Sequence, residues 1–176
     1  SEIKGTEAAI KYLLYGSLST VLYLYGVVML YGLTATTGMV EVAGILGQTN
    51  SSFNIFIYLG LTLLLLGLSF KIALMPFYFW APDVYESIPL PALSMVAVPS
   101  KIAATVLFIR LFSVLFPLEN FSLQFVLIVL IVISISFANV LALLQKNFRR
   151  MLAYSSIAQA GYMLIGLLYN AEFNKE

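Results

Sequence analysis

Residues 68–101 read LSFKIALMPFYFWAPDVYESIPLPALSMVAVPSK, and the rest of the chain is arranged around this stretch. Its two lysines, Lys71 and Lys101, stand inside apolar runs, and each lies near a proline, Pro76 and Pro99 respectively. An amine in the middle of a membrane span is costly, so it indicates a functional site. We therefore predict that the two lysines are stations on a proton path and that the surrounding segments bury them.

The composition is that of a polytopic membrane protein. Of the 176 residues, 61% are hydrophobic and only 10% are charged. A soluble domain has about a quarter of its residues charged, so a soluble fold is excluded. The net charge of +1 gives no indication of nucleic-acid binding.

The sequence contains no cysteine and no histidine. This excludes disulfides, thiolate or imidazole metal sites and histidine-ligated haem. It also has neither a Gly-x-Gly-x-x-Gly motif nor a Walker loop, so no nucleotide site is visible. We expect no cofactor or metal in this chain. The energy that moves charge across the membrane, about 2.3 kcal/mol per 100 mV, must then come from a partner.

Apolar segments long enough to cross a bilayer predict an all-α membrane fold with five transmembrane helices. No β-barrel alternation is present. The polar residues 34–52 and the acidic, proline-rich residues 82–91 predict a loop and a turn between helices. The predicted spans cover about residues 7–31, 53–80, 92–116, 121–144 and 151–169.

The second predicted span is too long for a simple crossing, since about 28 residues would extend for about 42 Å. Pro76 lacks an N–H and frees the carbonyl of Ile72, which predicts a break just after Lys71. Pro99 has the same effect on Met95 in the third span. Gating candidates are the two prolines and an acid in the predicted turn: Pro76, Pro99 and Asp83.

Both lysines are predicted at the same depth, about 15 Å from the inner turn. Burial favours a neutral amine, and two ammonium groups about 10 Å apart repel by about 1.7 kcal/mol at an effective dielectric of 20. Such a lateral pair is suited to sharing one proton. The alternative is a lysine that snorkels or is permanently paired with an acid, but Asp83 and Glu86 lie in the predicted turn.

Further polar residues on the predicted helices leave two interpretations open. Glu7 and Lys11 lie one turn apart and form either a structural ion pair near the membrane surface or a proton entrance. Four other polar side chains either line internal water or bond neighbouring helices. They are Ser94, Thr105, Ser155 and Gln159.

Basic loop residues set the predicted orientation. Lys4, Lys146, Arg149 and Arg150 fall on one side of the predicted spans, and Lys175 falls on the other. The positive-inside rule then places the N-terminus on the matrix or cytoplasmic side. The richness in Tyr, Phe, Ile and Asn favours a mitochondrial inner membrane, with a bacterial plasma membrane as the alternative.

Six motifs occur in an order that resembles a known family. They are TEAAIKYLLYGSLST (6–20), YGVVMLYG (25–32), FKIALMPFYFWAPDVYE (70–86), PSKIAA (99–104), IRLF (109–112) and QKNFRRMLAYSSIAQAGYMLIG (145–166). FWAPDVYE and MLAYSSIAQAGY are the most specific. The chain resembles the antiporter-like subunits of respiratory complex I, and above all the N-type subunit, which is NADH dehydrogenase subunit 2 in mitochondria.

The resemblance implies a fold of fourteen helices in two inverted repeats, each with a broken helix. This chain resembles helices six to ten, so residues 1–176 are expected to form one partial antiporter-like domain. The family's broken-helix lysine falls on Lys71, its bridging lysine on Lys101, and its surface Glu/Lys pair on Glu7 and Lys11. Its fifth-helix glutamate and twelfth-helix lysine have no counterpart here. Tyr78 replaces a usual histidine and SIPLP (87–91) a Gly-Ala-Pro-Thr-Pro-like turn, so we expect altered gating.

The resemblance also implies a role and partners. We expect a proton-translocating membrane-arm subunit of NADH:ubiquinone oxidoreductase, with NADH, FMN, Fe–S clusters and quinone in partner subunits. Lipids, other membrane-arm subunits and a chain that supplies the flanking helices are the expected partners, unless this chain is a fragment. The alternatives are a subunit of a multi-subunit sodium/proton antiporter and an inert structural assembly element.

Overall fold

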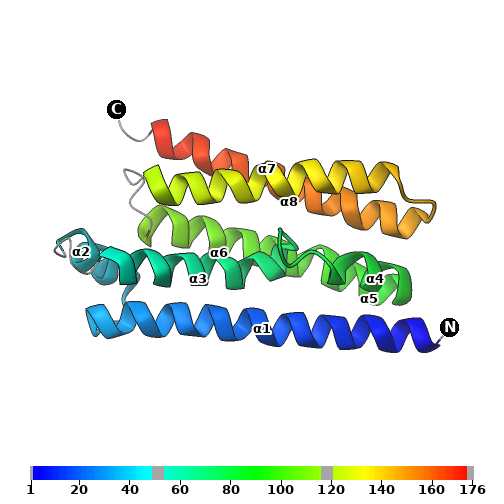
Figure 1. Cartoon of the computed structure of the whole chain (residues 1–176), viewed down its shortest axis with the longest axis horizontal. Helices are drawn as coiled ribbons and strands as arrows, with labels where there is room; N and C mark the ends of the chain where they lie inside the picture. Colours follow the sequence, from blue (N-terminus) through cyan, green and yellow to red (C-terminus); the bar gives the residue numbers. More distant parts are fainter. Residues whose placement is uncertain (1, 49–53, 116–120, 174–176) are drawn as a thin grey trace.

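The computed structural model describes residues 2–48, 54–115 and 121–173, and these residues form helices joined by short connections. The helices run side by side, with α1 along one flank, α7 and α8 along the other, and α3 and α6 between them (Figure 1). Their bounds are α1 Glu2–Thr34, α2 Met39–Gln48, α3 Asn54–Ile72, α4 Trp80–Ser87, α5 Leu90–Ala97, α6 Pro99–Leu115, α7 Phe121–Leu143 and α8 Phe148–Phe173.

Four stretches among the described residues are long and apolar enough to cross a membrane. They are Gly5–Thr34, Ile55–Ile72, Leu90–Leu115 and Phe125–Leu143. The all-helical membrane fold is therefore confirmed, whereas the fifth predicted span, 151–169 within α8, stays a prediction. The predicted bounds Phe53 and Phe116 lie outside the described residues.

The predicted break after Lys71 is present, because α3 ends at Ile72. Ala73 has a positive φ of 59°, the left-handed conformation that ends many helices. The N–H groups of Leu74 and Ala73 donate to the carbonyls of Ser69 (2.9 Å) and Phe70 (3.0 Å), which is the Schellman pattern. The helix thus ends before it reaches Pro76, which follows a cis peptide bond in the connecting segment.

The predicted turn at 82–91 is wrong for most of its length. Trp80–Ser87 is the helix α4, and α5 begins at Leu90. Pro82 lies in the first turn of α4, where its missing N–H would have no helical partner, and the acidic Asp83 suits that end of a helix. The chain reverses only at Ile88 and Pro89, both of which are extended.

Two further predicted boundaries are corrected. The predicted loop at 34–52 contains α2, whose Val42 is buried in the core beside Leu30. The third predicted span begins earlier than residue 92, and α5 and α6 meet at Val98, where the helical path is interrupted. Pro99 begins α6, a position where the fixed φ of proline favours helix.

Polar groups at the break find partners on other elements. The Met75 N–H donates to Ser134 Oγ of α7 at 3.0 Å, and Ser134 is buried. Trp80 Nε1 donates to the Phe70 carbonyl at 3.2 Å, which ties α4 to the end of α3. Such partners are what allow a non-helical backbone to lie at membrane depth.

Gly26 permits the close packing of α1 on α3. A Cβ added to Gly26 would lie 2.7 Å from the Gly60 carbonyl oxygen and 2.8 Å from the Leu64 nitrogen. These are backbone atoms, so no side-chain rotation relieves the clash, and the helices would have to separate.

We therefore expect Gly26→Ala to destabilise the chain by about 1–3 kcal/mol, the usual cost of overpacking. The matched control is Gly32→Ala on the same helix, where an added Cβ meets nothing within 4 Å. Thermal stability of the detergent-solubilised protein in its assembly checks this. Equal melting temperatures for the two variants would contradict the packing role of Gly26.

Candidate functional site

Lys101, on α6, carries a half-buried amine whose partners are neutral groups. Its Nζ donates to Ser156 Oγ of α8 at 2.8 Å and lies 3.3 Å from the Ser156 carbonyl oxygen. It also lies 5.9 Å from the ring centroid of Tyr85, on α4, which is within the range of a cation–π contact. The tyrosine hydroxyl is 3.2 Å from Ser156 Oγ. Three helices thus converge on one ammonium group.

Lys71 occupies the last turn of α3, immediately before the break. The C-terminal end of a helix carries a partial negative charge, which favours an ammonium group there. Lys71 lines a pocket of about 440 Å³ together with Ser19 and Thr20 of α1 and Ser100 of α6. Its Nζ also lies 5.8 Å from the Phe70 ring centroid. Lys71 is exposed whereas Lys101 is half-buried, so the prediction that the surrounding segments bury both lysines is wrong for Lys71 within the described residues.

The two amines turn to different sides of α6. Ser100 lines the pocket of Lys71, whereas the next residue, Lys101, binds α8. Successive residues of an α-helix point about 100° apart, which accounts for the difference. The direct lateral pair stays a prediction.

In the part of the chain that the structure describes, no carboxylate forms an ion pair with Lys71 or Lys101. The acids of α4 are instead engaged at the end of the bundle near the N-terminus. This placement agrees with the expectation that Asp83 and Glu86 lie too far from the lysines to neutralise them.

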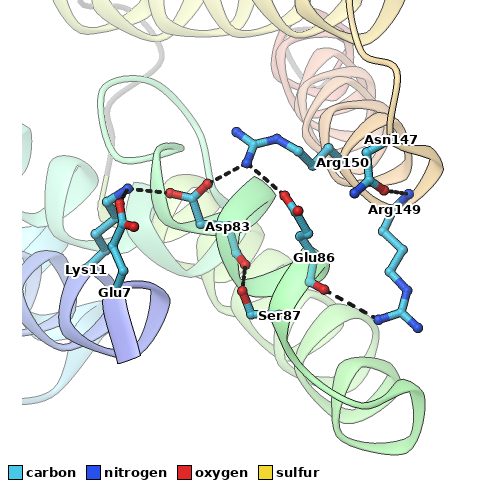
Figure 2. A network of polar contacts seen from close by, with 8 residues as sticks. All are labelled: Glu7, Lys11, Asp83, Glu86, Ser87, Asn147, Arg149 and Arg150. Atoms are coloured by element: carbon cyan, nitrogen blue, oxygen red, sulfur yellow. Dashed lines mark hydrogen bonds and ion pairs between the residues drawn. The ribbon is translucent and has the colours of Figure 1, made fainter. Parts of the chain in front are cut away.

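Asp83 is the centre of a charged network that joins α1, α4 and α8 (Figure 2). It accepts hydrogen bonds from Lys11 at 2.7 Å and from Arg150 at 2.8 Å. Lys11 also pairs with Glu7 at 2.6 Å, and Arg150 with Glu86 at 3.0 Å. The predicted Glu7–Lys11 ion pair is therefore present, and it is one end of a longer chain of charges.

The network keeps Arg150 charged, and a polar pocket lies beside its acids. Partial burial acts to lower the pKa of Arg150, but its hydrogen bond to Glu86 and the charge of Asp83 outweigh burial and raise that pKa above its usual value. Arg150 therefore stays charged. A polar pocket of about 140 Å³ opens beside Glu7, Asp83 and Glu86, with room for water.

The start of α8 is built to present its arginines to α4. Asn147 Oδ1 accepts the backbone N–H of Arg149 at 3.0 Å, as an N-cap residue does. The Arg149 guanidinium donates to the Glu86 carbonyl at 3.5 Å (Figure 2) and to the Ile88 carbonyl at 3.4 Å, at the C-terminal end of α4. A cation there suits the helix dipole.

The other predicted residues do not converge on the lysines. Ser94 is exposed and donates to Pro91 O, and Thr105 donates to Lys101 O within its own helix. Ser155 and Gln159 are exposed on α8, and Pro76 is exposed in the connecting segment. Their predicted water-lining and gating roles, like that of Asp83, stay predictions.

Sequence reasoning missed Ser156, Tyr85 and the link from Asp83 to Arg150. In the run Tyr154-Ser155-Ser156, two adjacent serines are equally polar, and only the packing of α8 shows which one faces inward. Tyr85 lies in the segment that composition predicts to be a turn, and only as part of the helix α4 does its ring lie beside Lys101.

The chain matches, over residues 1–175, the transmembrane family described as NADH:quinone oxidoreductase/Mrp antiporter. It belongs to this family. NAD(P)H-quinone oxidoreductase subunit 2 from Trichodesmium erythraeum is 42% identical over 171 residues, which cover 96% of this chain and 32% of that protein. NADH-quinone oxidoreductase subunit N from Trichlorobacter lovleyi is 42% identical over 93% of this chain and 34% of its own length.

A solved structure also matches. A chain of respiratory complex I from Thermus thermophilus superposes with a TM-score of 0.78 and 39% identity, over 96% of this chain and 35% of that one. The antiporter-like fold is thus confirmed, and the chain is a membrane protein of the family. It spans about a third of the length of the relatives it matches.

Proposed function

We propose that this chain is a proton-translocating section of an N-type, antiporter-like subunit in a membrane-bound NADH:quinone oxidoreductase. The observation that carries the proposal is Lys101, an amine of an apolar helix whose described partners are hydroxyl and carbonyl groups. A carboxylate would fix the ammonium, whereas neutral partners leave both protonation states accessible.

Lys71 and Lys101 act as the two proton stations in this proposal. Lys71 faces the pocket between α1, α3 and α6, and Lys101 faces α8, so a proton passes from one side of α6 to the other. Water in the Lys71 pocket would carry it, since about 440 Å³ holds several molecules. The network of Glu7, Lys11 and Asp83, beside its polar pocket, supplies the entrance.

The driving energy comes from partner subunits. A chain without cysteine or histidine offers no thiolate or imidazole to bind iron. In this proposal Fe–S clusters, and with them NADH, FMN and quinone, are bound by other subunits, which act on the lysines through conformational or electrostatic coupling. The remaining membrane helices come from other membrane-arm subunits or a longer form of this chain.

The proposed location is an energy-transducing membrane, either a mitochondrial inner membrane or a bacterial plasma membrane. The N-terminus, the α4–α5 connection and the α7–α8 connection lie at one end of the bundle (Figure 1). Arg149 and Arg150 are at that end, so the positive-inside rule favours the matrix or cytoplasmic side for it.

Lys71→Met in the assembled complex tests the proposal. We expect proton flux through this path to fall at least about tenfold, since losing a station that lowers the barrier by about 1.4 kcal/mol has that effect. The ratio of protons moved to quinone reduced, measured in vesicles, would then fall. Lys146→Met, at an exposed lysine between α7 and α8, is the control and leaves the ratio unchanged.

The same experiment separates the alternatives. An unchanged ratio with impaired assembly would indicate an inert structural element and contradict the proposal. Sodium-dependent proton exchange without quinone reduction would instead indicate a subunit of a multi-subunit sodium/proton antiporter.

A further inference from the structure

We infer that Ser156 and Tyr85 are positioning residues for Lys101, and that their hydroxyls make its protonation reversible. The inference rests on the proposed function, because it concerns how a proton-carrying lysine is held. It starts from the geometry of two oxygens, Ser156 Oγ at 2.8 Å from Lys101 Nζ and Tyr85 Oη at 3.2 Å from Ser156 Oγ.

The hydrogen bonds around Ser156 determine which groups donate and which accept. A serine hydroxyl has one proton and two lone pairs. Ser156 donates its proton to the Ala153 carbonyl at 2.7 Å, one turn earlier in α8. Its oxygen therefore accepts from the Lys101 ammonium on one side and from the Tyr85 hydroxyl on the other. Both lone pairs are used, and the ammonium is bound without a counter-charge.

The same hydroxyl also suits the neutral amine. When Lys101 loses a proton, its nitrogen gains a lone pair and becomes an acceptor. The Ser156 O–H can rotate from the Ala153 carbonyl toward that lone pair, because a hydroxyl rotor needs no backbone movement. A carboxylate in this position could only accept hydrogen bonds. It would therefore stabilise the ammonium form and offer no donor to the neutral amine. Ser156 is thus a partner for both protonation states.

Tyr85 positions the Ser156 hydroxyl beside the Lys101 amine. Its side chain is 4% exposed, and its ring lies beside the Lys101 amine. It belongs to α4, whose Asp83 is bound to α1 and to α8. The charged network therefore holds Tyr85, and Tyr85 holds the hydroxyl that faces Lys101.

Of the ionisable groups on α4, Tyr85 faces the Lys101 amine, whereas the two acids are engaged elsewhere. Asp83 and Glu86 of α4 pair with Arg150 at the start of α8. Among the residues whose side chains the structure describes, the other titratable or charged groups of α6 and of α2, α3 and α8 packed on it are Glu41 on α2, Tyr58 and Lys71 on α3, Arg110 on α6, and Arg149, Tyr154 and Tyr162 on α8.

The test is the pH dependence of proton translocation by the assembled complex in vesicles. Ser156→Ala removes an acceptor of the ammonium, so the pH at which translocation is half-lost on the alkaline side moves down by about one unit. Tyr85→Phe, which removes one oxygen atom, moves it in the same direction by less. Ser156→Thr keeps the hydroxyl and retains the original profile.

Ser113→Ala is the matched control. Ser113 lies on the same helix as Lys101, is exposed, and donates only to the Arg110 carbonyl of its own helix at 3.1 Å. The pH profile of proton translocation in the Ser113→Ala variant is expected to equal that of the unchanged protein. This control separates the loss of any helix serine from the loss of the one at Lys101.

Two results would overturn the inference: an unchanged pH profile in both Ser156→Ala and Tyr85→Phe, or a shift in Ser156→Thr as large as that in Ser156→Ala. If Ser156→Ala does not assemble, Tyr85→Phe decides alone. Loss of flux in Lys71→Met with unchanged profiles in these variants rejects the inference and leaves the proposed function standing. Normal flux in Lys71→Met rejects the proposed function itself.

Discussion

Replacing Lys101 with methionine is expected to stop proton movement through this chain. Methionine keeps the length and the apolar stem of the side chain but cannot carry a proton. A charge crossing the centre of a helix without such a carrier meets about 2.5–3.5 kcal/mol, and each 1.36 kcal/mol costs a factor of ten in rate. We expect a decrease of about a hundredfold, measured as valinomycin-supported acidification of vesicles at a matched rate of quinone reduction.

Lys101→Arg distinguishes proton release from simple positive charge. Arginine keeps the charge and can still donate to Ser156, but its guanidinium does not deprotonate in proteins. Flux in this variant is expected to be as low as in Lys101→Met. Substantial flux with arginine would show that Lys101 provides only a fixed charge, and a relay through this residue would then be rejected.

Replacing Asp83 with asparagine is expected to give the second-largest effect. Asparagine preserves the size of the side chain but removes the charge that Lys11 and Arg150 share. An ion pair on the surface contributes up to about 1 kcal/mol and a buried one about 3–5 kcal/mol when one partner is lost, so we expect about 2 kcal/mol for this half-buried site. The measurements are the melting temperature of the purified complex and its proton flux, and both are expected to be lower in Asp83→Asn.

Glu7→Gln is the comparison for Asp83→Asn. The Glu7 side chain is 61% exposed and that of Asp83 21%, and Glu7 contacts only Lys11 among the cations of the network. Its substitution should therefore cost at most about 1 kcal/mol. Equal destabilisation by the two substitutions would contradict the central position of Asp83.

Much of the fold followed from length and hydrophobicity. Long apolar runs in a chain with few charges leave helices as the only way to satisfy the backbone in lipid. The break after Lys71 was also predictable, and the structure adds that the left-handed Ala73 follows the last helical residue, Ile72. Proline disfavours helix in the residues before it, and the predicted position of the break, just after Lys71, was right.

The helix α4 was not predictable from local composition. Three prolines and two acids in residues 82–91 are typical of a turn. Pro82 nevertheless falls in the first turn of a helix, and the acids find cations on α1 and α8 that are distant in sequence. Tertiary ion pairs of this kind leave no mark on a single sequence, and together with the burial of Trp80, Val84 and Tyr85 they favour the helix over the local preference for a turn.

The candidate site was predictable in its charges and not in its neutral partners. Two lysines in apolar runs attract attention because their burial is costly. Ser156 and Tyr85 do not, since hydroxyl groups are common in membrane helices. Which serine faces the amine depends on the rotation of α8 against α6, which is set by packing over both helices.

The hydrogen bond from Met75 to Ser134 has a mechanical consequence. Residues 73–79 are not helical, and one of their backbone amides relies on a hydroxyl of α7. If this segment changed its path while α7 stayed in place, that amide would be left without a partner, at a cost of several kcal/mol in hydrocarbon. Motion of the interrupted element would therefore have to carry α7 with it.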